Sequence, residues 1–296
     1  MTTHHTGTIA VFGATGQQGG AVVDALLTRG SRVRALVRTP GSDRARALAA
    51  RGVDLSTIDV DDPASLATAL KAVDAFYFMT PESHSPGETE NEIRLGATLI
   101  DAAVAARVPN VVFNSVSGAE HDSGVAHFAS KGRIEDLLRR SGLRATMVRP
   151  VVFMDNFAKL PLTVRDGELV LKMPVPDGVG LKLVAVKDIG LVAAAILLGT
   201  AVVPGGAVEV IGDELTGSQI AAVFGAHTGL PARYEALPLS VLGGDLEEEA
   251  MFRWFAKGSA YPSDLAAVRA IEPTTWDLAE WIRATAWTVP ADEVRS

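Results

Sequence analysis

Short apolar runs alternate with helical patterns through the first half of the chain. The predicted strands cover residues 8–12, 32–38, 55–59, 75–79, 111–115 and 145–148. Between them, apolar residues recur on one helical face around residues 22–27, 44–51, 64–71, 90–107 and 127–140. Strands that alternate with helices in this way build βαβ units with right-handed crossovers. The pattern therefore predicts an α/β fold with a doubly wound parallel sheet.

The pattern changes after Pro150, where prolines and glycines interrupt short strand-like pieces. Residues 208–211 resemble one more sheet strand, and the four tryptophans all follow it. We expect residues 1–154 to form the first domain, with residues 184–213 contributing to it. Residues 155–296 then form a smaller, discontinuous α+β domain over the carboxyl ends of the strands, where open α/β sheets bind their ligands.

A glycine motif stands directly after the first strand and before the first helix. Its residues are Gly13-Ala14-Thr15-Gly16-Gln17-Gln18-Gly19. In this context the glycines turn the chain, let the backbone approach a pyrophosphate and let the helix pack on the strand. The unpaired N–H groups at the helix start attract the phosphates. We predict a Rossmann-type site for a dinucleotide at Gly13, Thr15, Gly16, Gln17, Gln18 and Gly19; the alternative is a glycine-rich loop without a ligand.

The end of the second strand indicates which dinucleotide binds. An acidic residue there would accept the ribose hydroxyls of NAD, but this chain has Arg38, with Arg34 and Arg44 nearby. A guanidinium suits a 2′-phosphate, so NADP(H) is the predicted cofactor. The alternative is that Arg38 is an exposed strand-end charge. Asp59, after the third strand, is a candidate for the adenine amino group or else a surface turn residue.

Composition and charge exclude several other classes of protein. The net charge of −8 argues against direct binding to nucleic acid, and a chain without cysteine has no disulfide or thiolate chemistry. The start of the chain has no secretory pattern, and the longest apolar stretch, residues 189–203, is too short to span a membrane. We therefore expect a cytoplasmic protein. The six histidines show no metal-ligand spacing, so no metal site is predicted.

Two acidic groups have structural interpretations. Asp61-Asp62 is interpreted as a turn and helix cap, and Glu247-Glu248-Glu249 as a solvated helix start, because negative charge suits the N-terminus of a helix.

Several stretches together resemble the NmrA-like family of atypical short-chain dehydrogenase/reductases. They are 13–20, 33–40, 127–132, 148–150, 186–190 and 251–256. The resemblance implies an NADP-binding Rossmann domain with a small C-terminal domain. It also implies two kinds of protein, namely redox-sensing regulators and reductases of quinones, enones or phenolic ethers. Thr80 and Pro150, at strand ends, are further candidates for cofactor contact.

The same resemblance identifies candidate catalytic residues. The wider superfamily has a Tyr-x-x-x-Lys pair on the helix after the fifth strand, where tyrosine donates a proton and lysine holds the nicotinamide ribose. Here Lys131 matches the lysine, His127 stands at the tyrosine position, and Ser115 matches the serine, with Ser117 as an alternate. Histidine titrates near pH ~6.5 and tyrosine near ~10, so histidine is the poorer donor at neutral pH. Simple carbonyl reduction is therefore less expected than reduction of a quinone or enone, and His127 could also be a structural histidine.

The predicted function is an NADPH-dependent reductase of a small conjugated or aromatic carbonyl compound. The alternative is a catalytically silent NADP(H) sensor that regulates a protein partner. Expected partners are thus a small-molecule substrate or a protein, and a homodimer is left open as the oligomer.

Overall fold

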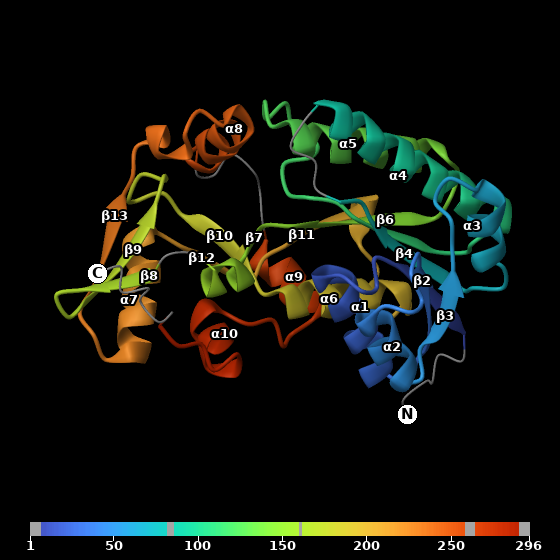
Figure 1. The fold of residues 1–296 in the computed structure, drawn as a ribbon, viewed down its shortest axis with the longest axis horizontal. Helices are drawn as coiled ribbons and strands as arrows, with labels where there is room; N and C mark the ends of the chain where they lie inside the picture. The colour runs from blue at the N-terminus through green and yellow to red at the C-terminus, as the bar shows by residue number, and fades with distance from the viewer. Residues whose placement is uncertain (1–6, 82–85, 160–161, 258–263, 290–296) are drawn as a thin grey trace.

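A seven-stranded parallel sheet forms the larger part of the molecule (Figure 1). The computed structural model describes residues 7–81, 86–159, 162–257 and 264–289. The strand order is β11-β6-β5-β4-β1-β2-β3, and every neighbouring pair is parallel. The strands are β1 (Thr8–Phe12), β2 (Arg32–Val37), β3 (Asp54–Thr57), β4 (Ala75–Met79), β5 (Val111–Asn114), β6 (Ala145–Pro150) and β11 (Ala207–Val210).

Helices cover both faces of this sheet (Figure 1). One layer contains α3 (Pro63–Ala69), α4 (Pro86–Ala106) and α5 (Ala126–Arg140), and the other contains α1 (Gln17–Thr28), α2 (Asp43–Ala50) and α6 (Val186–Leu197). Successive strand residues point to opposite faces. Thus Ile9 and Val11 pack under α1 and α6, whereas Ala10 packs under the other layer. The doubly wound fold predicted from the alternation of strands and helices is confirmed.

The layer of α1 and α6 is packed unusually closely at one point. A Cβ atom on Gly190 would lie 2.4 Å from the carbonyl oxygen of Ala21. Only glycine lets the two helix backbones approach this far. The close contact fixes α1, and with it the turn that precedes α1.

The chain after β6 builds a second region with two small sheets and its own core. One sheet has the order β12-β10-β7, and the other has the order β13-β9-β8. Their strands are β7 (Val152–Phe153), β8 (Leu162–Arg165), β9 (Glu168–Met173), β10 (Leu181–Val184), β12 (Asp213–Leu215) and β13 (Ala232–Ala236). Its helices are η1 (Met154–Ala158), α7 (Gly217–Thr228), η3 (Leu239–Leu242), α8 (Leu246–Phe255) and α10 (Leu278–Ala284). Two further helices pack with the large sheet instead, namely η2 (Pro204–Gly206), which precedes β11, and α9 (Leu265–Ile271), which contacts α6 and β11.

The tryptophans divide between the two regions. Trp281 and Trp287 are buried in the core of the second region, with Trp276 packed against it. Trp254 on α8 packs instead into the core of the sheet region. Helix α8 therefore joins the second region to the larger sheet. The boundary predicted between residues 154 and 155 stays a prediction.

Several elements differ in length from their predicted ranges. Helix α4 starts at Pro86 rather than near residue 90, and β6 continues to Pro150. The predicted last strand exists as β11 and pairs in parallel with β6. Asp62 caps α3 as expected, because its carboxylate accepts the Ala64 N–H at 2.9 Å. Among the described residues, no helix combines the length and the apolar character needed to cross a membrane.

Candidate active site

The glycine turn lies between β1 and α1, at the carboxyl edge of the sheet. Gly13 has a φ of +84°, which favours glycine, and its carbonyl accepts the Gly16 N–H at 2.9 Å. A Cβ on Gly19 would lie 2.2 Å from the Gly13 carbonyl oxygen. The turn thus closes on itself because Gly19 has no side chain. Gly16 caps α1 without a side-chain hydrogen bond, which leaves the start of the helix accessible to an anionic group.

The two glutamines and Thr15 stand at this same turn. Gln17 and Gln18 begin α1, and the Gln18 side-chain oxygen accepts from Asn114 Nδ2 at 2.5 Å. This bond ties the start of α1 to the end of β5. The Thr15 carbonyl accepts from Arg44 Nη1 at 3.4 Å, so α2 also contributes a guanidinium to the turn.

The three arginines proposed for the phosphate end have different surroundings. Arg38, directly after β2, is exposed, as is Arg44. Arg34 is committed elsewhere, since its Nε bonds Asp54 at 2.9 Å and its Nη1 bonds the Ala69 carbonyl at 3.0 Å. The structure therefore leaves Arg38 and Arg44 as the cations at this edge that could meet a 2′-phosphate.

Asp59 is an exposed turn residue after β3. Its Oδ1 accepts the Asp61 N–H at 3.0 Å, and its own N–H donates to Ser65 Oγ at 3.1 Å. These bonds explain its conformation without a ligand, and contact with an adenine stays a prediction.

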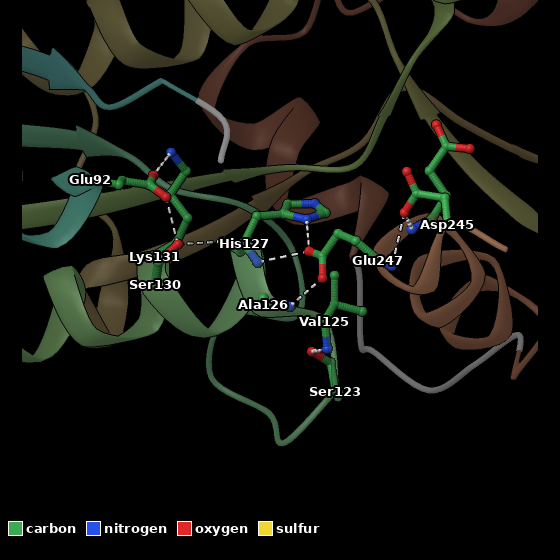
Figure 2. Close-up of polar contacts among 10 residues, drawn as sticks. Glu92, Ser123, Val125, Ala126, His127, Ser130, Lys131, Asp245 and Glu247 are labelled. Atoms are coloured by element: carbon green, nitrogen blue, oxygen red, sulfur yellow. Dashed lines mark hydrogen bonds and ion pairs between the residues drawn. The ribbon is translucent and has the colours of Figure 1, made fainter. Parts of the chain in front are cut away.

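Lys131 lies in a buried cluster with Glu92 and Ser130 (Figure 2). Buried Thr80 belongs to the same cluster. Its Nζ forms an ion pair with Glu92 Oε1 and donates to the Thr80 carbonyl and hydroxyl oxygens, each at 2.8 Å. Glu92 also accepts from Ser130 at 2.6 Å and from the Thr80 hydroxyl at 2.7 Å. Glu92 is not among the site residues predicted from the sequence. A buried ammonium needs such a partner, so Glu92 fixes where Lys131 lies.

His127, four residues before Lys131, is buried and bonded to Glu247 from the second region (Figure 2). Its Nδ1 lies 2.6 Å from Glu247 Oε1, and its backbone N–H donates to the same oxygen at 3.0 Å. The other oxygen of Glu247 accepts the Ala126 N–H at 3.1 Å. Glu247 therefore caps α5 and holds the His127 ring.

The interpretation of Glu247 as a solvated residue is thus wrong. Its side chain is 14% exposed because α8 docks on the start of α5. Burial alone would raise the pKa of Glu247, but hydrogen bonds from the His127 backbone and ring and from Ala126 outweigh burial and lower this pKa below its usual value. At neutral pH Glu247 is a carboxylate, which can only accept hydrogen bonds.

Ser115 and Pro150, the remaining candidates, are buried at the ends of β5 and β6. Arg149, next to Pro150, pairs with Glu135 through Nε at 2.9 Å and Nη2 at 2.7 Å. Its Nη1 lies 3.3 Å from Glu209. Burial raises the pKa of Glu209 to about 7, and the Arg149 cation opposes this shift. The candidates therefore border a second buried group of charges.

The site residues predicted from the sequence thus gather along one edge of the sheet, at the ends of β1, β2, β3, β4, β5 and β6 and at the start of α5. Within the described part of the chain, no cluster of three or more histidines and carboxylates could hold a metal ion.

The model of the NmrA-like family matches residues 5–282. The chain belongs to the NmrA-like family. The resemblance stated from the sequence motifs is therefore confirmed. A curated relative, the NAD(P)H azoreductase of Xenophilus azovorans, is 33% identical over 236 residues, which are 78% of this chain and 77% of the relative. Quinone oxidoreductase 2 of Escherichia coli is 29% identical over 267 residues, which cover 88% of this chain and 85% of the relative.

Solved structures agree with this assignment of family and fold. The NADPH complex of the Escherichia coli quinone oxidoreductase QOR2 superposes with a TM-score of 0.79 at 26% identity and covers 94% of this chain and all of that one. The regulator NmrA superposes with a TM-score of 0.77 at 19% identity, covering 96% of this chain and 99% of NmrA, which shows the shared fold alone. The named cofactors of these relatives agree with the prediction of a nicotinamide dinucleotide.

Proposed function

We propose that this protein is an NADPH-dependent reductase that acts on a quinone or another small conjugated carbonyl compound. The proposal rests on one observation: two features lie together at the carboxyl edge of the sheet. The first is a turn that only glycine can form, and the second is a buried pair of His127 and Lys131 on α5. The names of the relatives, which describe a quinone oxidoreductase and an azoreductase, support the same reaction class.

The residues present fit a dinucleotide with a 2′-phosphate. The Gly13–Gly19 turn can close because Gly19 has no Cβ to clash with the Gly13 carbonyl oxygen, and the start of α1 that it leaves uncapped would receive a pyrophosphate. Exposed Arg38 and Arg44 would pair with the 2′-phosphate. When bound, NADPH supplies the hydride. Lys131 would orient the nicotinamide ribose. It would contact the ribose while it keeps its bonds to Glu92 and Thr80.

Quinone reduction suits a site without the superfamily tyrosine. A hydride and one proton convert a quinone to a hydroquinone, and the aromatic ring gained makes the product a stable one. The demand on the protein is thus to position the acceptor and to supply a proton. His127 is the buried titratable group that stands where the superfamily has its proton donor.

The test is NADPH oxidation by the purified protein with 1,4-benzoquinone, a cyclic enone and an azo dye. Binding of NADPH is measured first, by quenching of tryptophan fluorescence. We expect saturable turnover with the quinone and tighter binding of NADPH than of NADH. Binding of NADPH without turnover on any of these acceptors would contradict the reductase and favour the silent sensor.

A further inference from the structure

The contact between α8 and the start of α5 brings a carboxylate from the second region onto the His127 ring (Figure 2). Asp245 caps α8 by accepting the N–H groups of Glu247 and Glu248, each at 3.0 Å, and so places Glu247 in the first turn. Two turns further along α8, Trp254 meets Phe128 edge-on with ring centroids 6.5 Å apart. The position of Glu247 is therefore fixed by both a cap and an aromatic contact.

Three donors converge on the Glu247 carboxylate, and one of them is the imidazole. Two would be sufficient to cap α5, since Ala126 and His127 supply two backbone N–H groups. The shortest of the three contacts, 2.6 Å, is the one to Nδ1. Because an ionised carboxylate only accepts, Nδ1 must carry the proton. The opposite ring nitrogen, Nε2, is then the atom through which His127 exchanges protons.

We propose that Glu247 is a positioning residue of the reductase: it holds the protonated Nδ1 of His127, so that Nε2 delivers the proton to the reduced substrate. The inference rests on the proposed function. In the reaction, the imidazolium would give its Nε2 proton to a quinone oxygen, and bound NADPH would supply the hydride. The products are NADP⁺, hydroquinone and neutral His127, which regains a proton from water.

This arrangement makes the active site depend on both regions of the molecule. Lys131 and His127 belong to α5, but the group that orients the histidine lies 120 residues further along the chain. A carboxylate on one ring nitrogen fixes the orientation of an imidazole and stabilises the cation that it becomes. Docking of α8 would thus complete the proton donor.

The test compares Glu247→Gln with Glu248→Gln in the full-length protein, using NADPH and 1,4-benzoquinone. Glutamine keeps an oxygen for the backbone N–H groups but removes the charge, and Glu248 is an exposed residue in the same helical turn. We expect Glu247→Gln to lower kcat about ten- to a hundredfold, because general acid catalysis contributes on this scale. The Kd for NADPH stays unchanged, and Glu248→Gln behaves like the wild type.

Two measurements separate positioning from simple capping. In a His127→Gln background, Glu247→Gln should cause no further loss of kcat, because its effect acts through the histidine. In proton NMR spectra, the wild type and Glu248→Gln should show a downfield Nδ1–H signal that Glu247→Gln lacks.

Equal losses of kcat in both backgrounds, or a downfield signal that survives in Glu247→Gln, would overturn the inference and leave the reductase standing. A wild-type protein that binds NADPH but does not reduce the quinone would instead overturn the proposed function, and the inference with it.

Discussion

The glycine turn and the start of α5 lie at the same edge of the sheet, but one is formed by backbone atoms and the other by side chains. The turn is made by backbone atoms, and its shape depends on the absence of a Cβ at Gly19. The α5 site is made by charged side chains, Lys131 with Glu92 and His127 with Glu247, that come from three helices. Substitutions should therefore act by steric displacement at the turn and by loss of charge balance at α5.

The largest effect on cofactor binding should come from Gly19→Ala. The new methyl carbon would lie 2.2 Å from the Gly13 carbonyl oxygen, so the turn must open. We expect the affinity for NADPH to fall at least about a hundredfold, or roughly 3 kcal/mol, in a binding titration. Gly41→Ala is the matched control, since a Cβ there meets no atom within 4 Å. Equal binding by both variants would show that the turn does not contact the cofactor.

At α5 we expect Lys131→Met to lower the stability of the fold, and a second substitution at Glu92 to restore it. Lys131→Met leaves the Glu92 carboxylate buried without its cation, and we expect a loss of about 3–5 kcal/mol in the free energy of unfolding by urea. Replacing both residues, as Lys131→Met with Glu92→Leu, should restore most of this stability. NADPH affinity should stay low in the double variant if Lys131 holds the ribose.

An exposed ion pair between the same two helices provides the control. Arg133 and Glu90 lie 2.7 Å apart with side chains 58% and 65% exposed, so Arg133→Met should cost less than about 1 kcal/mol. If Lys131→Met lowered the free energy of unfolding by no more than Arg133→Met does, burial of the Lys131–Glu92 pair would not increase the cost of removing its cation.

The two sites also differ in how much of them the sequence discloses. The turn is formed by residues close together in the chain, so spacing alone predicts it. The partners of Lys131 and His127 lie 39 and 120 residues away, and only the fold brings them together. The spacing of residues within a short stretch identifies the glycine loop and the histidine–lysine pair. It does not identify an ion-pair partner that is distant in the sequence.

A weaker signal for these partners was present in the helical patterns. Glu92 precedes the buried Leu99 by seven residues, and Glu247 precedes the buried Trp254 by the same interval. Residues seven apart share a helical face, so each carboxylate stands on a face that is buried. A charge on an apolar face needs a partner and should be interpreted as part of a site.

A third effect concerns Glu209, whose pKa burial raises to about 7 from an ordinary 4.5. Between these values the folded protein keeps a proton that the unfolded chain has released, so stability falls as the pH rises. Glu209→Gln removes this penalty. We expect the variant to be more stable than the wild type by about 3 kcal/mol at pH 8 but by less than about 1 kcal/mol at pH 5.

Urea unfolding at the two pH values measures this difference, with exposed Glu90→Gln as the control. A stability gain that is the same at both pH values would show that Glu209 does not titrate between them.

The smallest effect should come from Arg38, the exposed side chain directly after β2. Arg38→Ser removes one guanidinium that would pair with the 2′-phosphate, while the turn itself stays intact. We expect the preference for NADPH over NADH, as a ratio of Kd values, to fall about tenfold, or roughly 1.4 kcal/mol. Arg32→Ser is the matched control, because Arg32 is exposed on the same strand at its opposite end. An unchanged ratio in Arg38→Ser would contradict the assignment of Arg38. The 2′-phosphate contact would then be assigned to Arg44, an exposed residue that bonds the Thr15 carbonyl of the turn.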